Sequence, residues 1–232
     1  ELGGKDPAYV RADANFDYSV TELVDGAFFN SGQSCCGIER IYVHDSLYTQ
    51  FVEAYIEKVN TLTLSNPIDP STTLGPVVKT SAADWVRQQI KDAVTLGAKP
   101  CIDTTKFHHA AEGTPYIAPE VLIDVDHSMS VMTEESFGPV VGIMSVGSDE
   151  QAVHLMNDSD LGLTASLWTQ DQSAGEHLGN RLQTGTVFMN RCDYLDPALT
   201  WTGIKNTGRG ATLSVLGYQQ LTQPKSFHLK NV

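Results

Sequence analysis

The sequence contains few cysteines, few basic residues and no long apolar run. Four cysteines in 232 residues are too sparse for a disulfide scaffold, and the adjacent Cys35 and Cys36 lack the C-x-x-C spacing of zinc and redox sites. Lysine and arginine total 15 against 28 acidic residues, so the net charge is −13 and no nucleic-acid partner is expected. No stretch approaches the roughly 18 apolar residues of a membrane-spanning helix, so no membrane partner is expected either.

These absences favour a globular protein of a reducing compartment. The first residues show no charged stretch followed by an apolar one, so we expect no secretory signal and a cytoplasmic location. Because the chain begins at Glu1 and not at Met, a mitochondrial location stays open as an alternative. The length and the 41% hydrophobic content suit one large domain, or one domain with an appended segment.

Hydrophobic periodicity alternates between helical and extended segments. Apolar residues at helical spacing predict helices over residues 17–29, from an N-cap at Asp45 or Ser46 to about 59, from about 81 to a stop at Gly97, and over 149–156, 173–182 and 213–218. β-branched and apolar runs predict strands over 41–43, 99–102, 117–123, 140–146, 164–168 and 186–189, with a final extended run over 226–230. This alternation predicts an α/β fold, an open sheet with crossover helices.

Three short motifs could carry chemistry. Residues 32–37 read GQSCCG, a tight turn before a cysteine that can act as a nucleophile if its thiolate is stabilised. Residues 1–5 read ELGGK, where two glycines let the backbone approach a ligand and Glu1 could act as a general base. Residues 134–139 read EESFGP, where carboxylates could bind sugar hydroxyls beside an aromatic ring. Taken singly, each motif is more often a packed cysteine or a hydrated loop.

Together the three motifs resemble the signatures of the aldehyde dehydrogenase superfamily. Residues 1–5 match its E-L-G-G-K signature, residues 28–35 its F-x-x-x-G-Q-x-C signature, and residues 134–139 its E-E-x-F-G-P cofactor motif, in the family's order and at its spacing. The Gly-rich tail at 203–210, GIKNTGRG, is similar as well, with Thr207 where serine is common. The resemblance covers nearly the whole chain.

The resemblance implies NAD(P)-dependent oxidation of an aldehyde to a carboxylic acid. Cys35 would be the nucleophile that forms a thiohemiacetal and then a thioester, with its backbone N–H in the oxyanion hole, and Glu1 would activate the hydrolytic water. Glu135, Phe137 and the Leu2 carbonyl would contact the nicotinamide end of NAD or NADP. The presence of Glu1 favours hydrolysis over transfer to coenzyme A.

The resemblance also implies a substrate entrance and a domain plan. Arg191, Tyr194 and Trp201 would line the aldehyde entrance, where they suit a medium-sized or aromatic aldehyde, or a semialdehyde that bears a carboxylate. Residues 1–200 would form the catalytic domain and 201–232 a C-terminal crossover and oligomerisation segment of a homodimer or homotetramer. No G-x-G-x-x-G motif is present, so the family's N-terminal dinucleotide-binding domain is absent from this chain, which we expect to be inactive alone.

Other readings of the same residues stay open. A cysteine-dependent esterase would use Cys35 and Glu1 but would not need Glu135 and Phe137, and a non-catalytic oligomerisation module would need none of them. His108, His109 and Glu112 have a spacing that metal ligands can show, but no further ligands accompany them, so no metal site is predicted. Cys101 and Cys192 are expected to be packing residues.

Overall fold

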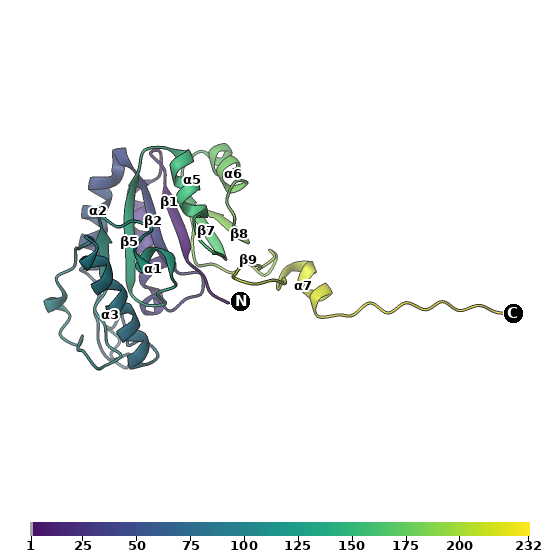
Figure 1. The fold of residues 1–232 in the computed structure, drawn as a ribbon, viewed down its shortest axis with the longest axis horizontal. Coiled ribbons are helices and arrows are strands. Elements are labelled where there is room, and N and C mark those ends of the chain that lie inside the picture. Colours follow the sequence, from purple (N-terminus) through teal and green to yellow (C-terminus); the bar gives the residue numbers. More distant parts are fainter. Residues whose placement is uncertain (1) are drawn as a thin grey trace.

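A seven-stranded sheet forms the centre of the protein in a computed structural model that describes residues 2–232 (Figure 1). The spatial order is β3-β4-β5-β2-β1-β7-β8, and every neighbouring pair is parallel except β3 with β4. The strands are β1 (Asp6–Val10), β2 (Ile38–His44), β3 (Lys99–Pro100), β4 (Glu120–Ile123), β5 (Val140–Val146), β7 (Thr164–Trp168) and β8 (Thr186–Met189). The expected α/β fold is therefore confirmed.

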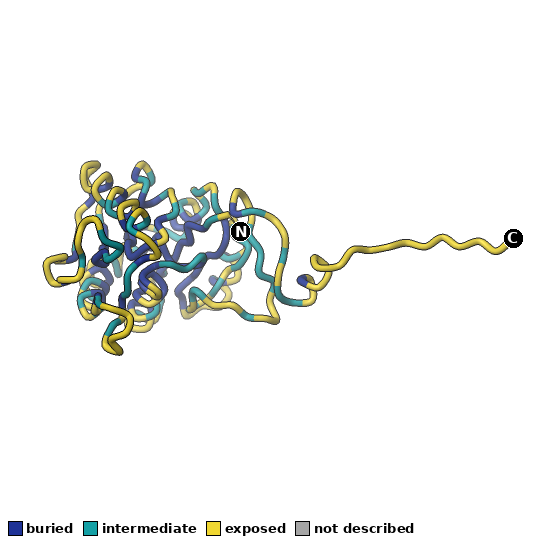
Figure 2. The backbone as a smooth tube through the Cα atoms, turned by 90° about the horizontal axis from the view of Figure 1, so that it is seen from below, coloured by how far each residue is buried: buried dark blue, intermediate teal, exposed yellow. Residues whose placement is uncertain are grey.

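Helices cover both faces of the sheet and make it the middle of three layers. One core lies between the sheet and the helices α1 (Phe16–Phe28) and α2 (Asp45–Val59). The other core lies under α3 (Thr80–Thr95), α4 (Ser130–Thr133), α5 (Asp149–Asn157) and α6 (Gln172–Gly179). Successive strand residues alternate between the two cores, since Ala8 and Val10 belong to the first and Tyr9 to the second. The buried residues accordingly concentrate along the strands (Figure 2).

Parallel pairing brings the three sequence motifs to one edge of the sheet. The residues that precede β1, β2 and β5 are the segments 1–5, 32–37 and 134–139. Because these strands run the same way, with Asp6 beside Ile38 and Arg40 beside Gly142, their preceding loops all lie at the amino-terminal edge. Segments far apart in the sequence thus meet in space.

Several sequence-based boundaries needed correction. The strands at 140–146, 164–168 and 186–189 have the expected bounds, whereas β3 is shorter than 99–102 and β4 begins at Glu120. The N-cap of α2 is His44, whose ring nitrogen accepts a hydrogen bond from the Ser46 N–H at 3.3 Å, so the expected N-cap at Asp45 or Ser46 was wrong. The sequence analysis missed the central strand β1 because its sequence begins with Asp and Pro, which are unfavourable in strands.

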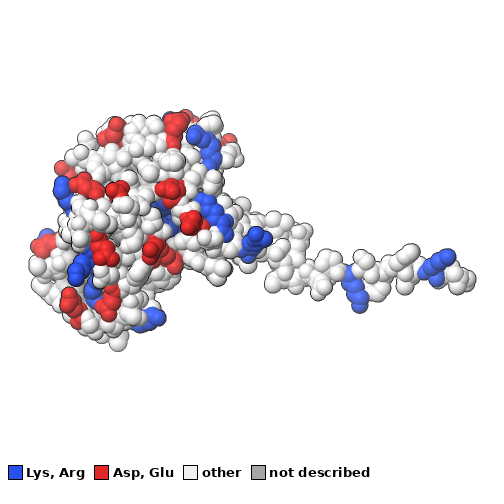
Figure 3. All heavy atoms as spheres, viewed as in Figure 1, with Lys and Arg blue, Asp and Glu red and all other residues white. Residues whose placement is uncertain are grey.

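The last part of the chain leaves the folded body. The short strands β6 (Leu161–Gly162) and β9 (Ile204–Lys205) pair antiparallel, and α7 (Ser214–Gln220) follows. Beyond α7 the chain extends away from the domain, and the run 226–230 joins no sheet within the described residues (Figures 1 and 2). Acidic side chains are spread over the visible face of the body, whereas the tail shows basic ones (Figure 3). No helix among residues 2–232 is long and apolar enough to span a bilayer.

Candidate active site

The loop before Cys35 is a tight turn that only glycine allows at one point. After α1, the 3-10 turn η1 (Phe29–Gly32) contains Asn30, Ser31 and Gly32, all with positive φ. A Cβ on Gly32 would lie 2.2 Å from the Gly138 carbonyl oxygen, so the cysteine loop and the EESFGP loop are in direct backbone contact here. The Gln33 side chain accepts the Val78 N–H at 2.7 Å and donates to the Asn30 carbonyl at 2.9 Å, which fixes the turn.

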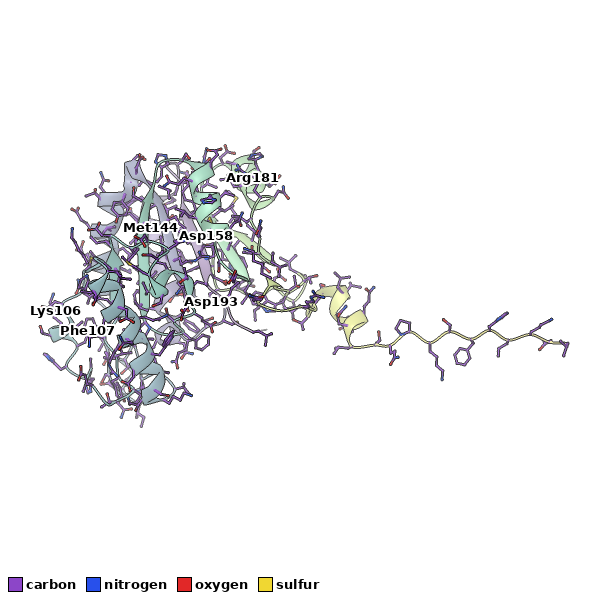
Figure 4. All side chains as sticks on the ribbon, in the orientation of Figure 1. Lys106, Phe107, Met144, Asp158, Arg181 and Asp193 are labelled. Carbon is purple, nitrogen blue, oxygen red and sulfur yellow. The ribbon has the colours of Figure 1, made fainter. Side chains whose placement is uncertain are left out.

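The two adjacent cysteines lie in different environments. Cys35 is half-buried, whereas Cys36 is buried and its Sγ donates to the Asp193 carboxylate at 2.8 Å. Burial, followed by this hydrogen bond, raises the pKa of the Cys36 thiol well above its usual range. Asp193 also accepts the Ser34 hydroxyl at 2.9 Å, so it connects the segment after β8 to the cysteine loop; Figure 4 labels it at the lower end of the sheet.

The ELGGK segment touches both other loops. Glu1 lies outside the described residues. The Gly4 N–H donates to the Glu135 carboxylate at 2.9 Å, and a Cβ on Gly4 would lie 2.6 Å from the Cys35 carbonyl oxygen. The second glycine of the motif is therefore required by close packing against the cysteine loop. Leu2 lies beside them with 79% of its surface exposed.

The EESFGP loop brings Glu135 to the ELGGK segment and carries the partly exposed Phe137 two residues later. The Trp85 indole N–H on α3 donates to the Glu135 carbonyl at 3.0 Å. Phe137 has a φ of 51°, unusual for a bulky residue, and 40% of its surface is exposed. A Cβ on the next residue, Gly138, would meet Val86 at 2.5 Å, so α3 holds this loop closely from outside.

A buried ion pair, missed by sequence reasoning, joins the three loops. Lys5 Nζ lies 2.6 Å from the Glu39 carboxylate and 3.1 Å from the Ser136 hydroxyl. Glu39 in turn accepts the N–H groups of Ser136 and Phe137 at 2.8 and 2.9 Å. Burial lowers the pKa of Lys5, while the neighbouring Glu39 opposes that shift. The available signals were a lysine directly before one buried strand and a glutamate at the second position of another, since such charges must be paired when buried.

Thr207 ties the Gly-rich tail to the ELGGK segment. Its hydroxyl donates to the Gly3 carbonyl at 2.8 Å and accepts the Gly162 N–H at 2.9 Å. Its carbonyl accepts the Leu2 N–H at 2.8 Å. A hydroxyl is therefore used at this buried position, and threonine supplies it where serine is common in the family signature.

The three residues expected at the aldehyde entrance take part in two separate interactions. Arg191 stacks on Tyr194, with Cζ 3.3 Å from the ring centroid, and both flank Asp193. Trp201 instead pairs with Thr212 through two backbone hydrogen bonds of 2.9 Å, and no described contact joins it to the other two. Cys192 packs against the core, where burial raises its pKa to about 12.

No metal centre accompanies this arrangement within residues 2–232, where no three His, Cys, Asp or Glu side chains could hold an ion together. The site can therefore offer a half-buried thiol, a carboxylate, an exposed ring and backbone donors. That set suits attack on a carbonyl carbon next to a bound planar heterocycle.

Comparison with known proteins places the chain in a family. The sequence model of the aldehyde dehydrogenase family matches residues 1–227. An NADP-dependent succinate-semialdehyde dehydrogenase of Mycobacterium ulcerans is 34% identical over 226 residues, which are 97% of this chain and 49% of that protein. The chain therefore belongs to the aldehyde dehydrogenase family.

Solved structures share the fold. Betaine aldehyde dehydrogenase of Staphylococcus aureus in complex with NAD+ superposes with a TM-score of 0.87 at 30% identity, over 94% of this chain and 44% of that one. An NADP-dependent glyceraldehyde-3-phosphate dehydrogenase of Bacillus halodurans, complexed with NADP, gives 0.84 at 35% identity, over 91% and 43%. The chain spans about half the length of the curated relatives it matches.

Proposed function

We propose that this chain is the cysteine-bearing half of an NAD(P)-dependent aldehyde dehydrogenase that oxidises an aldehyde to a carboxylic acid. The observation that carries the proposal is the meeting of the three motif loops around Cys35, through the Gly4 to Glu135 hydrogen bond and the Gly32 to Gly138 contact. The cofactors named for the relatives, NADP and NAD+, support the same reading.

Cys35 is the proposed nucleophile. Its Sγ would form a bond to the aldehyde carbon, and the backbone N–H of Cys35 would stabilise the developing oxyanion. The raised pKa of Cys36 and Cys192 keeps both thiols protonated, which favours Cys35 among the three. Loss of hydride from the resulting thiohemiacetal leaves a thioester on Cys35, and a water activated by Glu1 would cleave its C–S bond to release the acid.

Glu135, Phe137 and Leu2 are the proposed contacts to the nicotinamide end of the cofactor. Three observations support this role: Glu135 accepts the Gly4 N–H and lies near Gly3, while Leu2 and Phe137 belong to the same two loops and are exposed. The glycine backbone between them would let a flat ligand approach closely. A bound NAD or NADP would supply the hydride acceptor for the oxidation. A pure esterase would have no use for this group of residues, which favours the dehydrogenase.

Two substrate classes are proposed for the segment 191–201. Tyr194 and Trp201 suit a medium-sized or aromatic aldehyde, whereas Arg191 suits a semialdehyde with a carboxylate. The relative named for succinate semialdehyde supports the second class. A substrate panel decides between them, and acetaldehyde as the best substrate by kcat/KM would contradict both.

The assembly is also a proposal. Residues 1–200 would form the catalytic domain and 201–232 the segment that meets a second subunit of a homodimer or homotetramer. Exposed apolar side chains in and after α7 support this, among them Val215, Tyr218, Leu221, Phe227 and Leu229. Sedimentation of the chain with and without residues 213–232 tests this proposal. The same number of subunits per particle for both chains would contradict it.

The chemistry is tested first by thiol labelling and by NADH formation. Iodoacetamide with peptide mapping should modify Cys35 before Cys36 and Cys192, and preferential labelling of Cys36 would contradict the assignment. In the full-length protein, Cys35→Ala should abolish oxidation, while Glu1→Gln should slow turnover and leave the initial burst of NADH. The 232 residues alone should show no significant NAD-dependent oxidation, because we expect the remaining half to hold the adenosine end of the cofactor.

A further inference from the structure

The Glu39 carboxylate binds backbone N–H groups of the EESFGP loop. It lies near the start of β2, four residues after Cys35, and is buried. One carboxylate oxygen accepts the Phe137 N–H at 2.9 Å, and the other accepts the Ser136 N–H at 2.8 Å and the Lys5 ammonium at 2.6 Å. A single side chain thus connects the strand that follows Cys35 with the loop that carries Glu135 and Phe137.

The Phe137 backbone needs such support. Its φ of 51° lies in the left-handed region, which an aromatic residue occupies only when its surroundings hold it there. Its N–H is bound by Glu39, and the following Gly138 is pressed against Val86. The direction of the partly exposed Phe137 ring is therefore set by its backbone conformation, which the Glu39 carboxylate holds.

Lys5 compensates the buried charge of the Glu39 carboxylate. An unpaired carboxylate at this depth would be strongly unfavourable, and Lys5, itself wholly buried, supplies the opposite charge. Lys5 also donates to the Ser136 hydroxyl at 3.1 Å. Both the backbone and the side chain of Ser136 are consequently fixed by the same ion pair.

We propose that Glu39 is a positioning residue for cofactor binding, a role that rests on the proposed dehydrogenase function. It does not touch the cofactor. Its two acceptor oxygens hold the Ser136–Phe137 backbone so that Phe137 and Glu135 face the nicotinamide end. Removal of the acceptors should weaken nucleotide binding and leave the reactivity of the Cys35 thiol in place.

The test uses two double variants of the full-length protein, so that neither contains a lone buried charge. Lys5→Met with Glu39→Leu removes the ion pair and both acceptor oxygens, whereas Lys5→Met with Glu39→Gln removes the charges and keeps one acceptor oxygen. We expect the Leu variant to raise the KM for the nucleotide about 10-fold or more, with kcat at saturating nucleotide changed by less than about 3-fold, since lost hydrogen bonds to a charged group weaken a site by about this factor. The Gln variant should show a smaller rise.

Two further readouts separate positioning from general damage. Amide hydrogen exchange should accelerate at residues 136 and 137 in the Leu variant, and the rate of Cys35 alkylation by iodoacetamide should stay as in the unaltered protein. An unchanged nucleotide KM in a folded variant overturns the proposal. If the unaltered protein oxidises no aldehyde, the proposed function fails, and exchange at residues 136 and 137 alone then decides the positioning role; if the Leu variant does not fold, the Gln variant decides it.

Discussion

The two edges of the central sheet use ion pairs in opposite ways. At the amino-terminal edge, Lys5 and Glu39 have side chains that are 0% and 7% exposed and hold three loops together. At the carboxyl-terminal edge, the side chains of Arg11 and Asp149 are 28% and 27% exposed; Arg11 follows β1, and Asp149 begins α5 just after β5. The chemical groups are comparable, but only the first pair is deprived of water, so only the first constrains its surroundings strongly.

The comparison also shows where this chain departs from a general rule of α/β sheets. Ligands usually bind beyond the carboxyl ends of parallel strands, at the point where the strand order reverses. Here the motif residues precede their strands and lie at the amino edge. Short, Gly-rich loops allow this because they pack backbone against backbone, as Gly4 does on Cys35 and Gly32 on Gly138.

The largest effect on stability is expected when only one partner of the buried Lys5–Glu39 ion pair is removed. Lys5→Met should lower the free energy of unfolding by about 3–5 kcal/mol, because Glu39 would keep a buried charge with no counterion. Urea unfolding measures it. Restoring neutrality with Lys5→Met and Glu39→Gln together should recover a large part of the loss, and a single variant as stable as the unaltered chain would contradict the burial of this charge.

A smaller effect is expected for the clamp between the tail and the ELGGK segment. Thr207→Val should cost about 1–3 kcal/mol, because the buried Gly162 N–H loses its acceptor and the Gly3 carbonyl its donor. Thr207→Ser is the matched control, since it keeps the hydroxyl. Equal unfolding free energies for the Val and Ser variants would show that the hydroxyl is not what matters.

The exposed pair at the carboxyl edge should matter little. Arg11→Met should change the free energy of unfolding by about 1 kcal/mol or less, because the pair is partly hydrated and Asp149 still accepts the Tyr9 hydroxyl at 2.8 Å. The change should shrink further in high salt. A loss as large as that of Lys5→Met would remove the contrast between the two edges.

The smallest effect concerns pH. His127 contacts the Tyr42 hydroxyl at 2.8 Å and Asp158 at 2.6 Å, with Asp126 and Arg40 nearby, and burial lowers its pKa from 6.5 although Asp158 opposes the shift. A lowered pKa means that the fold favours the neutral ring, so its contribution is present above about pH 6.5 and is lost as the pH falls through the folded pKa. Unfolding from about pH 7.5 to about pH 5 should therefore show a shallower decline for His127→Gln than for the unaltered chain. Equal declines of the unfolding free energy with falling pH in the two proteins would contradict this role of His127.

Local patterns predicted much of the fold and part of the candidate site. The strands β5, β7 and β8 and the helix α1 follow from apolar periodicity, and the motif segments were found by their composition and spacing. The strand β1 was missed because its stability comes from burial between β2 and β7, not from the propensities of Asp6 and Pro7. Whether Arg191 and Trp201 line one entrance could not follow from sequence, because it depends on tertiary contacts: Arg191 stacks on Tyr194 in its own segment, whereas Trp201 pairs with Thr212.

The sequence by itself determined the alternation of helices and strands and the three motifs, because these depend on residues close together in the chain. Only the tertiary structure decided which charges are buried and which cysteines have a raised pKa. Asp193 reaches Cys36 from 157 positions away, and Glu39 binds an N–H 98 positions away. Such contacts depend on which loops parallel strands bring to the same edge, and on the water that those loops exclude from it.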